Sequence, residues 1–390
     1  MVLYDKVWKN AVESIKAEGR LRCLRPVTRL PSSRIAFADA EPLLDFASND
    51  YLGLSHHPQM IATVRDYAAQ FGAGAGASRL VSGNLSVFEE IEKTLAVSKN
   101  MESALVFGSG VQANLTILPA LLDKHVLGTE PLIYADKLNH ASLIQGCIAA
   151  QAKQIRFRHN DLAHLESLLR RDESQNRPRF IITESVFSMD GDGPDISALA
   201  TLAERFNAFL YIDEAHATGV LGSDGFGLAC GLKNALVMGT FSKGLGGFGA
   251  YVAGSKALIS YLINRCGGLI YATALPPAVL GSMQASLALV PKMAVQRADL
   301  QRKAGILRQR LNEAGLDTGA STTQIVPLIL GSEQRALDLA AKLQQYGFYT
   351  VAIRPPTVPH GTSRLRLTVS ALHQDSEIHA LANAIISHCS

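Results

Sequence analysis

The sequence predicts an α/β fold in which helices cover both faces of a mainly parallel sheet. From Asp45 onward, short apolar runs alternate with helix-like stretches, as where SALVFGSG is followed by VQANLTILPALL. This alternation is typical of parallel sheets, because the chain must cross back over the sheet between strands. The chain also has 390 residues, too many for one compact core, so two closely associated domains are expected.

The parts of the chain follow this plan in order. Residues 4–20 carry apolar side chains at helical spacing and stop at Gly19, which predicts a helix followed by an arm rich in Arg and Pro. Six strand-like runs come next: SALVFGSG, PLIYADK, RFIITESV, AFLYIDE, NALVMGT and GAYVAGS. A helical tract then reaches about Gly315, and a strand-helix-strand-strand-helix order beyond it predicts a smaller α+β domain. We therefore expect a helix and arm at 1–48 that pack with the small domain, a large α/β domain at 49–275 and the small domain at 276–390.

Composition and charge narrow the class of protein. Hydrophobic residues make up 47% and charged residues 18%, which is ordinary for a globular enzyme. The net charge of +3 is spread along the chain, which argues against a nucleic-acid or membrane partner. The five cysteines are scattered without a C-x-x-C pair, so neither disulfides nor a metal site are indicated. No apolar run of 18 residues and no secretory segment occur, so we expect a soluble, cytoplasmic enzyme.

The stretch YIDEAHATG, residues 211–219, admits two interpretations. In many nucleic-acid motors the letters DEAH place an acidic pair beside Mg²⁺ and ATP. That interpretation needs a phosphate loop ending in Gly-Lys, and the dipeptide Gly-Lys never occurs in this chain. An Asp at the end of a strand with a His three residues later also holds the ring in some pyridoxal phosphate (PLP) enzymes. The second interpretation therefore remains.

A second motif, GLGGFG at 244–249, matches the glycine pattern of a dinucleotide site. Such a site must open a helix and be followed by an acidic residue about 20 positions later. Here the glycines run into a strand, AYVAGS, and residues 264–274 contain no acid. We therefore interpret this segment as a flexible turn beside an active site.

Lys243 stands directly before these glycines and after a buried-type strand. Small neighbours let a flat ligand approach the backbone, and a lysine in such a pocket can lose its proton and form an imine with an aldehyde. Asp213 ends another strand, where its carboxylate could keep a pyridine nitrogen protonated, and His216 could bond the ring's phenolic oxygen. Each residue also has an ordinary interpretation, as a loop lysine, a helix cap or a structural histidine.

Weaker candidates lie elsewhere. The amides of Gly110 and Val111 at the start of a helix suit a phosphate, although a plain strand-helix turn would look the same. His140 follows another strand and could stack on a flat cofactor. Arg354 begins a Pro-stiffened segment and could bind a carboxylate through its two forked donors. The alternative interpretation, for both Arg354 and Arg22, is an ordinary arginine on the surface.

Taken together, nine segments resemble the α-oxoamine synthase family of fold-type I PLP enzymes from about residue 20 to residue 375: NDYLGLSHHP, GAGASRLVSGN, GSGVQAN, NHASLIQG, ESVFSMDGD, DEAHATGVLG, TFSKGLGGFG, YATALPP and RPPTVPHGTSRLR. The resemblance implies a large, mainly parallel seven-stranded sheet domain that binds PLP, a smaller α+β domain, and a homodimer with its sites at the interface. It implies that Lys243 forms the Schiff base, Asp213 faces the ring nitrogen and His216 the phenolic oxygen. His140 would stack on the ring, with Ser188 nearby.

The resemblance also implies how the phosphate and the substrates are bound. The phosphate would be held by Gly110, Val111, Thr240 and Thr273, the last from the neighbouring subunit. The substrate would be bound by four further residues: Asn49, Arg354 and Thr357, with Arg22 on the far carboxylate of the acyl chain. Arg22 competes for that role with two neighbouring arginines.

The activity that the resemblance implies is acyl transfer: an amino acid condenses with an acyl thioester and loses CO₂. The segment AIRPPTVP and the short chain favour L-alanine and a pimeloyl thioester of CoA or acyl carrier protein, in biotin biosynthesis. The alternatives are a sister enzyme that uses glycine, such as 2-amino-3-oxobutyrate ligase or 5-aminolevulinate synthase, and a partner subunit without catalysis. The last is disfavoured because Lys243, Asp213 and His216 are all present.

Overall fold

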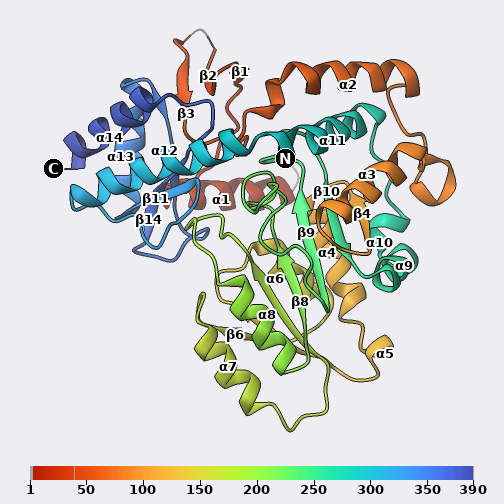
Figure 1. The fold of residues 1–390 in the computed structure, drawn as a ribbon. Coiled ribbons are helices and arrows are strands. Elements are labelled where there is room, and N and C mark those ends of the chain that lie inside the picture. The colour runs from red at the N-terminus through yellow and green to blue at the C-terminus, as the bar shows by residue number, and fades with distance from the viewer. Residues whose placement is uncertain (1–2, 39, 390) are drawn as a thin grey trace.

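The computed structural model describes residues 3–38 and 40–389 and confirms the predicted fold class. A sheet of seven strands forms the centre of the large domain (Figure 1), in the order β4 (Ser103–Phe107), β10 (Ala250–Gly254), β9 (Ala235–Thr240), β8 (Ala208–Asp213), β7 (Arg179–Glu184), β5 (Leu132–Asp136) and β6 (Gln154–Phe157). Only β10 runs antiparallel to its neighbours, β4 and β9. The parallel order brings the carboxyl ends of β5, β7, β8 and β9 to one edge, where α/β sheets bind ligands.

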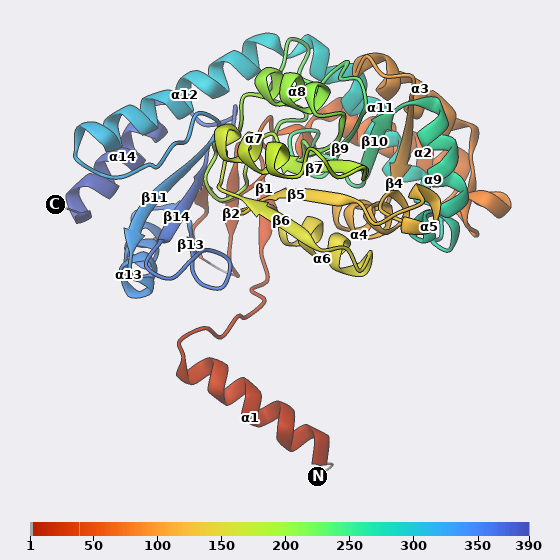
Figure 2. The same ribbon diagram turned by 90° about the horizontal axis from the view of Figure 1, so that it is seen from below.

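Helices cover this sheet on both faces, as Figure 2 shows. One face packs against α4 (Gly110–Leu121), α6 (Ala141–Ala149), α9 (Lys256–Arg265) and α10 (Gly267–Ile270). The other packs against α7 (Leu162–Arg171) and α8 (Ile196–Arg205). Neighbouring strand residues divide between the two cores, since successive side chains of a strand point to opposite faces: Ile182 belongs to the first core and Ile181 to the second.

A third core joins the sheet to the rest of the molecule. Around it lie η1 (Leu54–His56), α2 (Pro58–Phe71), the π-helical turn η2 (Arg79–Gly83), α3 (Ser86–Ser98), α11 (Pro277–Leu289), η3 (Val290–Lys292) and α12 (Ala294–Glu313). The short helix α5 (Lys124–Leu127) precedes β5. Among the described residues no single helix is long and apolar enough to cross a membrane; 277–292 and 294–313 pass that test only as a pair bent by 77°.

The C-terminal part is built on a three-stranded antiparallel sheet, β11 (Ile325–Gly331), β14 (Ser363–Thr368) and β13 (Val351–Ile353), with α13 (Glu333–Gln345) and α14 (Asp375–Cys389) beside it. A separate sheet joins the N-terminal strands β1 (Thr28–Leu30), β2 (Arg34–Ala36) and β3 (Leu43–Asp45) to β12 (Phe348–Tyr349). The arm is therefore fixed to the C-terminal part through the β3–β12 pairing. Helix α1 (Leu3–Ala17) extends away from the body (Figure 2).

Two details differ from the sequence analysis. Strand β6 was not among the six predicted runs, because it is an edge strand whose first three residues are polar or only partly buried. The second strand of the predicted strand-helix-strand-strand-helix order, the run FYTVAIRPP, is divided at Thr350, since β12 pairs with β3 and β13 pairs with β14. In both cases the pairing partner, rather than the local sequence, determines the strand.

Candidate active site

The candidate site lies where β7, β8 and β9 end side by side. In the sheet register Glu184 pairs with Asp213, and Asp213 pairs with Met238 of β9. Two carboxylates are therefore brought to the same level at the ends of adjacent strands. The turn that follows β9 carries Lys243 to this edge.

Lys243 and His216 are in direct contact. The Nζ atom of Lys243 lies 2.8 Å from Nε2 of His216, and the hydroxyl of Tyr51 lies 2.6 Å from Nδ1 of the same ring. Burial lowers the pKa of Lys243 to about 8, although the nearby carboxylates of Asp213 and Glu184 oppose the shift. Burial, helped by the positive charge of Lys243, also holds the pKa of His216 well below its usual range. The pair thus supplies a neutral imidazole and an amine that is readily deprotonated.

The turn around Lys243 presses against the DEAH turn. A side chain added at Gly219 would place its Cβ 2.6 Å from the carbonyl carbon of Gly244, and Gly219 has a φ of +92°. Both facts require glycine at this position. The GLGGFG segment forms a compact turn between β9 and β10 and opens no helix, so the prediction of a turn at this position is confirmed.

Asp213 is held by two donors. The side-chain amide of Asn114 donates to Oδ2 at 2.9 Å, and the backbone N–H of Ala215 donates to Oδ1 at 2.9 Å. The Oδ1 atom of Asn114 in turn accepts from the Tyr211 hydroxyl at 2.7 Å. Asp213 is only 4% exposed, and each of its carboxylate oxygens has a hydrogen-bond donor. Asn114 was part of a quoted motif but was not predicted as a site residue.

His140 caps helix α6 at the same edge. Its backbone N–H donates to Oε1 of Glu184 at 2.6 Å, and its Nδ1 lies 2.7 Å from the hydroxyl of Ser142. Ser142 also accepts from the side-chain amide of Asn114 at 2.9 Å, which connects His140 to the residue that holds Asp213. Burial raises the pKa of Glu184 well above its usual range, and the charge of Asp213 adds to this. Glu184 is a second residue that the sequence analysis did not single out.

The predicted phosphate residues lie around the start of α4. Ser109 caps this helix by accepting from Gln112 N–H at 3.1 Å, whereas the first-turn amides of Gly110 and Val111 have no helical carbonyl within reach. Thr240 donates to the carbonyl of Gly249 at 2.9 Å. Thr273 lines a cavity of about 70 Å³ together with Gly108 and Gln112.

Arg366 is the buried guanidinium of the site. Its Nη2 donates to Oδ1 of Asn49 at 3.0 Å, its Nε donates to the carbonyl of Ser188 at 2.5 Å, and Nη2 lies 3.5 Å from the Tyr51 hydroxyl that contacts His216. Asn49 and Ser188, both predicted, are therefore brought together by an arginine that was not. The available signal was the alternation in SRLRLT, which places Arg364 and Arg366 on the same face of β14.

The other predicted substrate residues form a separate group. Arg22 Nη2 lies 3.5 Å from Oγ1 of Thr357, and Nη1 of Arg354 donates to the carbonyl of Gly19 at 2.7 Å. All three line a cavity of about 1130 Å³ between the arm and the C-terminal sheet. Among the described residues, no hydrogen bond or ion pair joins them to Lys243, Asp213 or His216.

The donor set fits PLP. Lys243 offers an amine of lowered pKa for the aldehyde, and Asp213 offers a fixed carboxylate for a pyridinium nitrogen. The exposed ring of His140 and the free amides at the start of α4 offer a stacking face and an anion site. The hydroxyl of Ser185 is also buried at the end of β7 without a partner.

Comparison with known proteins agrees with this geometry. Residues 41–385 match the family Aminotransferase class I and II. A protein of Gluconacetobacter diazotrophicus named 8-amino-7-oxononanoate synthase is 50% identical over 388 residues, which is 99% of this chain and 97% of its own. The 8-amino-7-oxononanoate synthase of Francisella tularensis has a similar solved structure, with a TM-score of 0.76 and 27% identity over 89% of this chain and 98% of its own. A solved structure of SPT with PLP internal aldimine has a TM-score of 0.89 at 24% identity, over 100% and 98% of the two chains, and shows the same fold.

Proposed function

This chain belongs to the aminotransferase class I and II family, and we propose that within it the chain is an 8-amino-7-oxononanoate synthase that depends on PLP. It joins L-alanine to a pimeloyl thioester in biotin biosynthesis. A bond forms between the alanine α-carbon and the thioester carbonyl, the thiol leaves, and the alanine carboxyl departs as CO₂. The observation that carries this function is the amine of Lys243 at 2.8 Å from His216, beside the fixed carboxylate of Asp213. The name of the 50% identical relative supports the choice of substrates.

The cofactor would be held by Lys243, Asp213, His216 and His140, with its phosphate at the start of α4. When bound, PLP supplies an electron sink for the carbanion at the alanine α-carbon. Asn114 and the Ala215 N–H fix the orientation of the Asp213 carboxylate, which would face the ring nitrogen.

Proton transfer falls to Lys243. Its Nζ would be the base that removes the α-proton, and a pKa of about 8 suits a base that works near neutral pH. His216 is held neutral by burial and by its positive neighbours, so its Nε2 can accept a proton from Nζ or from a phenolic oxygen.

The carboxylate of alanine needs a guanidinium close to Lys243. Arg354 was predicted for this role, and Arg366 is the arginine whose contacts reach Tyr51 and Asn49 beside His216. We therefore propose Arg366 as a carboxylate ligand alongside the predicted Arg354. The cavity that Arg354 shares with Arg22 and Thr357 supports the assignment of the far carboxylate of the acyl chain to Arg22.

We further propose a cytoplasmic homodimer without nucleic-acid or membrane partners. The apolar side chains of α1 are exposed, Trp8 at 63%, and Tyr271 beside Thr273 is 86% exposed, which supports an interface with a second copy at both places. All five cysteines are free, as is usual in a reducing compartment.

The function is tested by measuring thiol release with alanine or glycine, each crossed with pimeloyl-CoA, pimeloyl acyl carrier protein and acetyl-CoA. The proposal expects turnover with alanine and a pimeloyl donor. Turnover with glycine and a short acyl donor would instead assign the chain to a sister enzyme. An absence of thiol release with all combinations, from protein shown to carry PLP by borohydride trapping of a separate sample, would overturn the function.

A further inference from the structure

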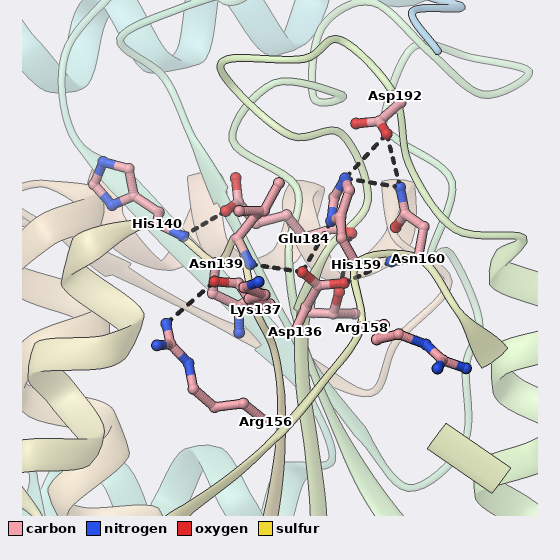
Figure 3. A network of polar contacts seen from close by, with 12 residues as sticks. Asp136, Lys137, Asn139, His140, Arg156, Arg158, His159, Asn160, Glu184 and Asp192 are labelled. Atoms are coloured by element: carbon pink, nitrogen blue, oxygen red, sulfur yellow. Dashed lines mark hydrogen bonds and ion pairs between the residues drawn. The ribbon is translucent and has the colours of Figure 1, made fainter. Parts of the chain in front are cut away.

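A second, partly buried polar cluster lies next to the candidate site (Figure 3). His159 stands between two carboxylates: its Nδ1 is 2.9 Å from Oδ1 of Asp136, and its Nε2 is 3.0 Å from Oδ2 of Asp192. Asn160 completes the cluster, because its side-chain amide donates to the same Asp192 oxygen at 3.0 Å and its backbone N–H donates to Oδ2 of Asp136 at 2.9 Å. None of these residues was predicted from the sequence, and none contacts Lys243 or His216 in the described structure.

The two aspartates place an acceptor at each ring nitrogen of His159, and the side-chain amide of Asn160 also lies 3.2 Å from Nε2. A carboxylate can only accept, so each aspartate needs an N–H, and only the imidazolium has two. The bonds to Asp136 and Asp192 raise the pKa of His159 to about 10 even though burial opposes this. The aspartates are 0% and 12% exposed in their side chains, so the cation compensates two largely buried anions.

Asp136 fixes the turn that carries His140. It ends β5, and its Oδ1 also accepts from the backbone N–H of Leu138 at 2.8 Å. Two residues further on, the backbone N–H of His140 donates to Glu184. The turn is therefore tied at both ends, by the His159 cluster on one side and by β7 on the other.

Asp192 fixes a different turn, residues 187–193, which follows β7. The backbone N–H of Phe187 donates to the carbonyl of Asp192 at 2.8 Å, and the Phe187 ring meets His159 edge-on with 4.4 Å between centroids. The same turn is bound from the C-terminal part: Ser188 accepts from Arg366, and Asp190 pairs with Arg364 at 2.5 Å. This turn thus joins the His159 cluster to the buried arginine of the site.

We propose that His159 is a positioning residue, whose imidazolium ties the turn that carries His140 to the turn that carries Ser188 and receives Arg366. The proposal rests on the proposed function for what these turns do, since His140 is there assigned to PLP and Arg366 to the substrate carboxylate. His159 itself touches neither ligand. Its effect is to hold the stacking face and the carboxylate ligand at a fixed separation.

The test compares His159→Gln and Asp192→Asn with a matched control, His164→Gln. His164 accepts from the backbone N–H of Arg158 at 2.9 Å and so supports the same loop without touching either aspartate. For each protein we would measure the Kd for PLP by absorbance titration of the cofactor-free form, the KM for L-alanine and kcat with a pimeloyl thioester, and the melting temperature.

Loss of the cation leaves two facing carboxylates and loosens both turns. Small displacements of positioned groups cost large factors, so His159→Gln should weaken PLP binding and raise the KM for alanine by at least about 10-fold. His164→Gln should stay within about 2-fold of wild type, as surface changes do. Because His159 and Asp192 act as one unit, the double variant His159→Gln/Asp192→Asn should lose no more PLP affinity, and raise the KM for alanine no further, than the more severe single variant.

Three results would overturn the proposal. The first is that His159→Gln has the same Kd for PLP and the same KM for alanine as His164→Gln. Another is a lower melting temperature with no change in either constant, which would mean that the cluster only stabilises the fold. The third is a double variant whose losses multiply. If His159→Gln does not fold, Asp192→Asn carries the same comparison. If wild-type protein shows no turnover, the proposed function fails, while the PLP titration still decides the role of His159.

Discussion

The pKa of Lys243 offers the most direct test of the site, because the neutral amine is the form that attacks an aldehyde. Burial lowers that pKa to about 8. At pH 7.5 a group with a pKa near 8 is roughly one quarter neutral, whereas an ordinary lysine with a pKa of about 10.4 is neutral in about one molecule in a thousand. The fold therefore raises the reactive fraction of Lys243 by about two hundredfold.

The assay is the rate at which cofactor-free protein captures PLP, followed by visible absorbance and fixed with borohydride at pH values from 6.5 to 10.5. The proton is bound more weakly in the folded protein than in a free lysine, so the rate should rise with pH and level off above about pH 8. A rate that still climbs steeply at pH 10 would refute the reasoning, since Lys243 would then behave as a solvated side chain.

Asp213→Asn tests how a neighbouring negative charge affects the pKa of Lys243. The negative charges of Asp213 and Glu184 raise the pKa of Lys243 against the effect of burial. Removing the Asp213 charge should therefore move the midpoint to lower pH, whereas Glu166→Gln, at a half-buried position of α7 that pairs with Arg170 and Arg205, should leave it unchanged. A midpoint that moves to higher pH in Asp213→Asn would contradict the geometry.

Three further predictions follow from the structure. Lys243→Ala should abolish turnover and borohydride trapping of PLP; thiol release at a wild-type rate would reject its role. Arg366→Lys removes the planar fork and should raise the KM for alanine by about 10-fold or more, since a bond to a charged group is worth about 1.5–3 kcal/mol; a larger effect of Arg354→Lys would return the carboxylate to Arg354. Lys99→Met should lower the free energy of unfolding by about 3–5 kcal/mol, because Glu214 is left buried without its cation; urea unfolding checks this, and a loss below about 1 kcal/mol, the range of an exposed pair, would contradict it.

The fold could be predicted because its signal is local. Apolar runs such as AFLYIDE and NALVMGT became β8 and β9 over nearly the expected residues. The positions of Asp213 and Lys243 followed from the same pattern, since a residue that ends a strand or directly follows it must lie at the carboxyl edge of a parallel sheet. The structure brings these two to the same edge as His216 and His140.

The residues that support them could not be predicted in this way, because their partners are far away in sequence. Asn114 meets Asp213 across 99 positions, and Arg366 meets Asn49 across 317. No local period records such a pair. Arg354 was predicted because prolines follow it, and Arg366 was not considered. The property that distinguishes Arg366 is its burial, with 7% exposure, against the turn at Ser188.

The acidic pair in DEAH shows how one strand serves two purposes. Successive side chains at the end of β8 diverge, as the pleat of a strand requires. Asp213 accepts from Asn114 and the Ala215 N–H and faces the ligand edge, whereas Glu214 pairs with the fully buried Lys99 and accepts from Leu228 N–H at 2.6 Å. Glu214 thus has its cation within the protein, and its carboxylate also accepts from the backbone N–H groups of Leu228 and Ala229. Asp213 has only neutral donors besides the nearby Lys243, so it is the carboxylate of the pair that remains available to a cationic ring. Exchanging the two residues would remove both functions, because an aspartate at 214 is one methylene shorter than the side chain that now reaches Lys99.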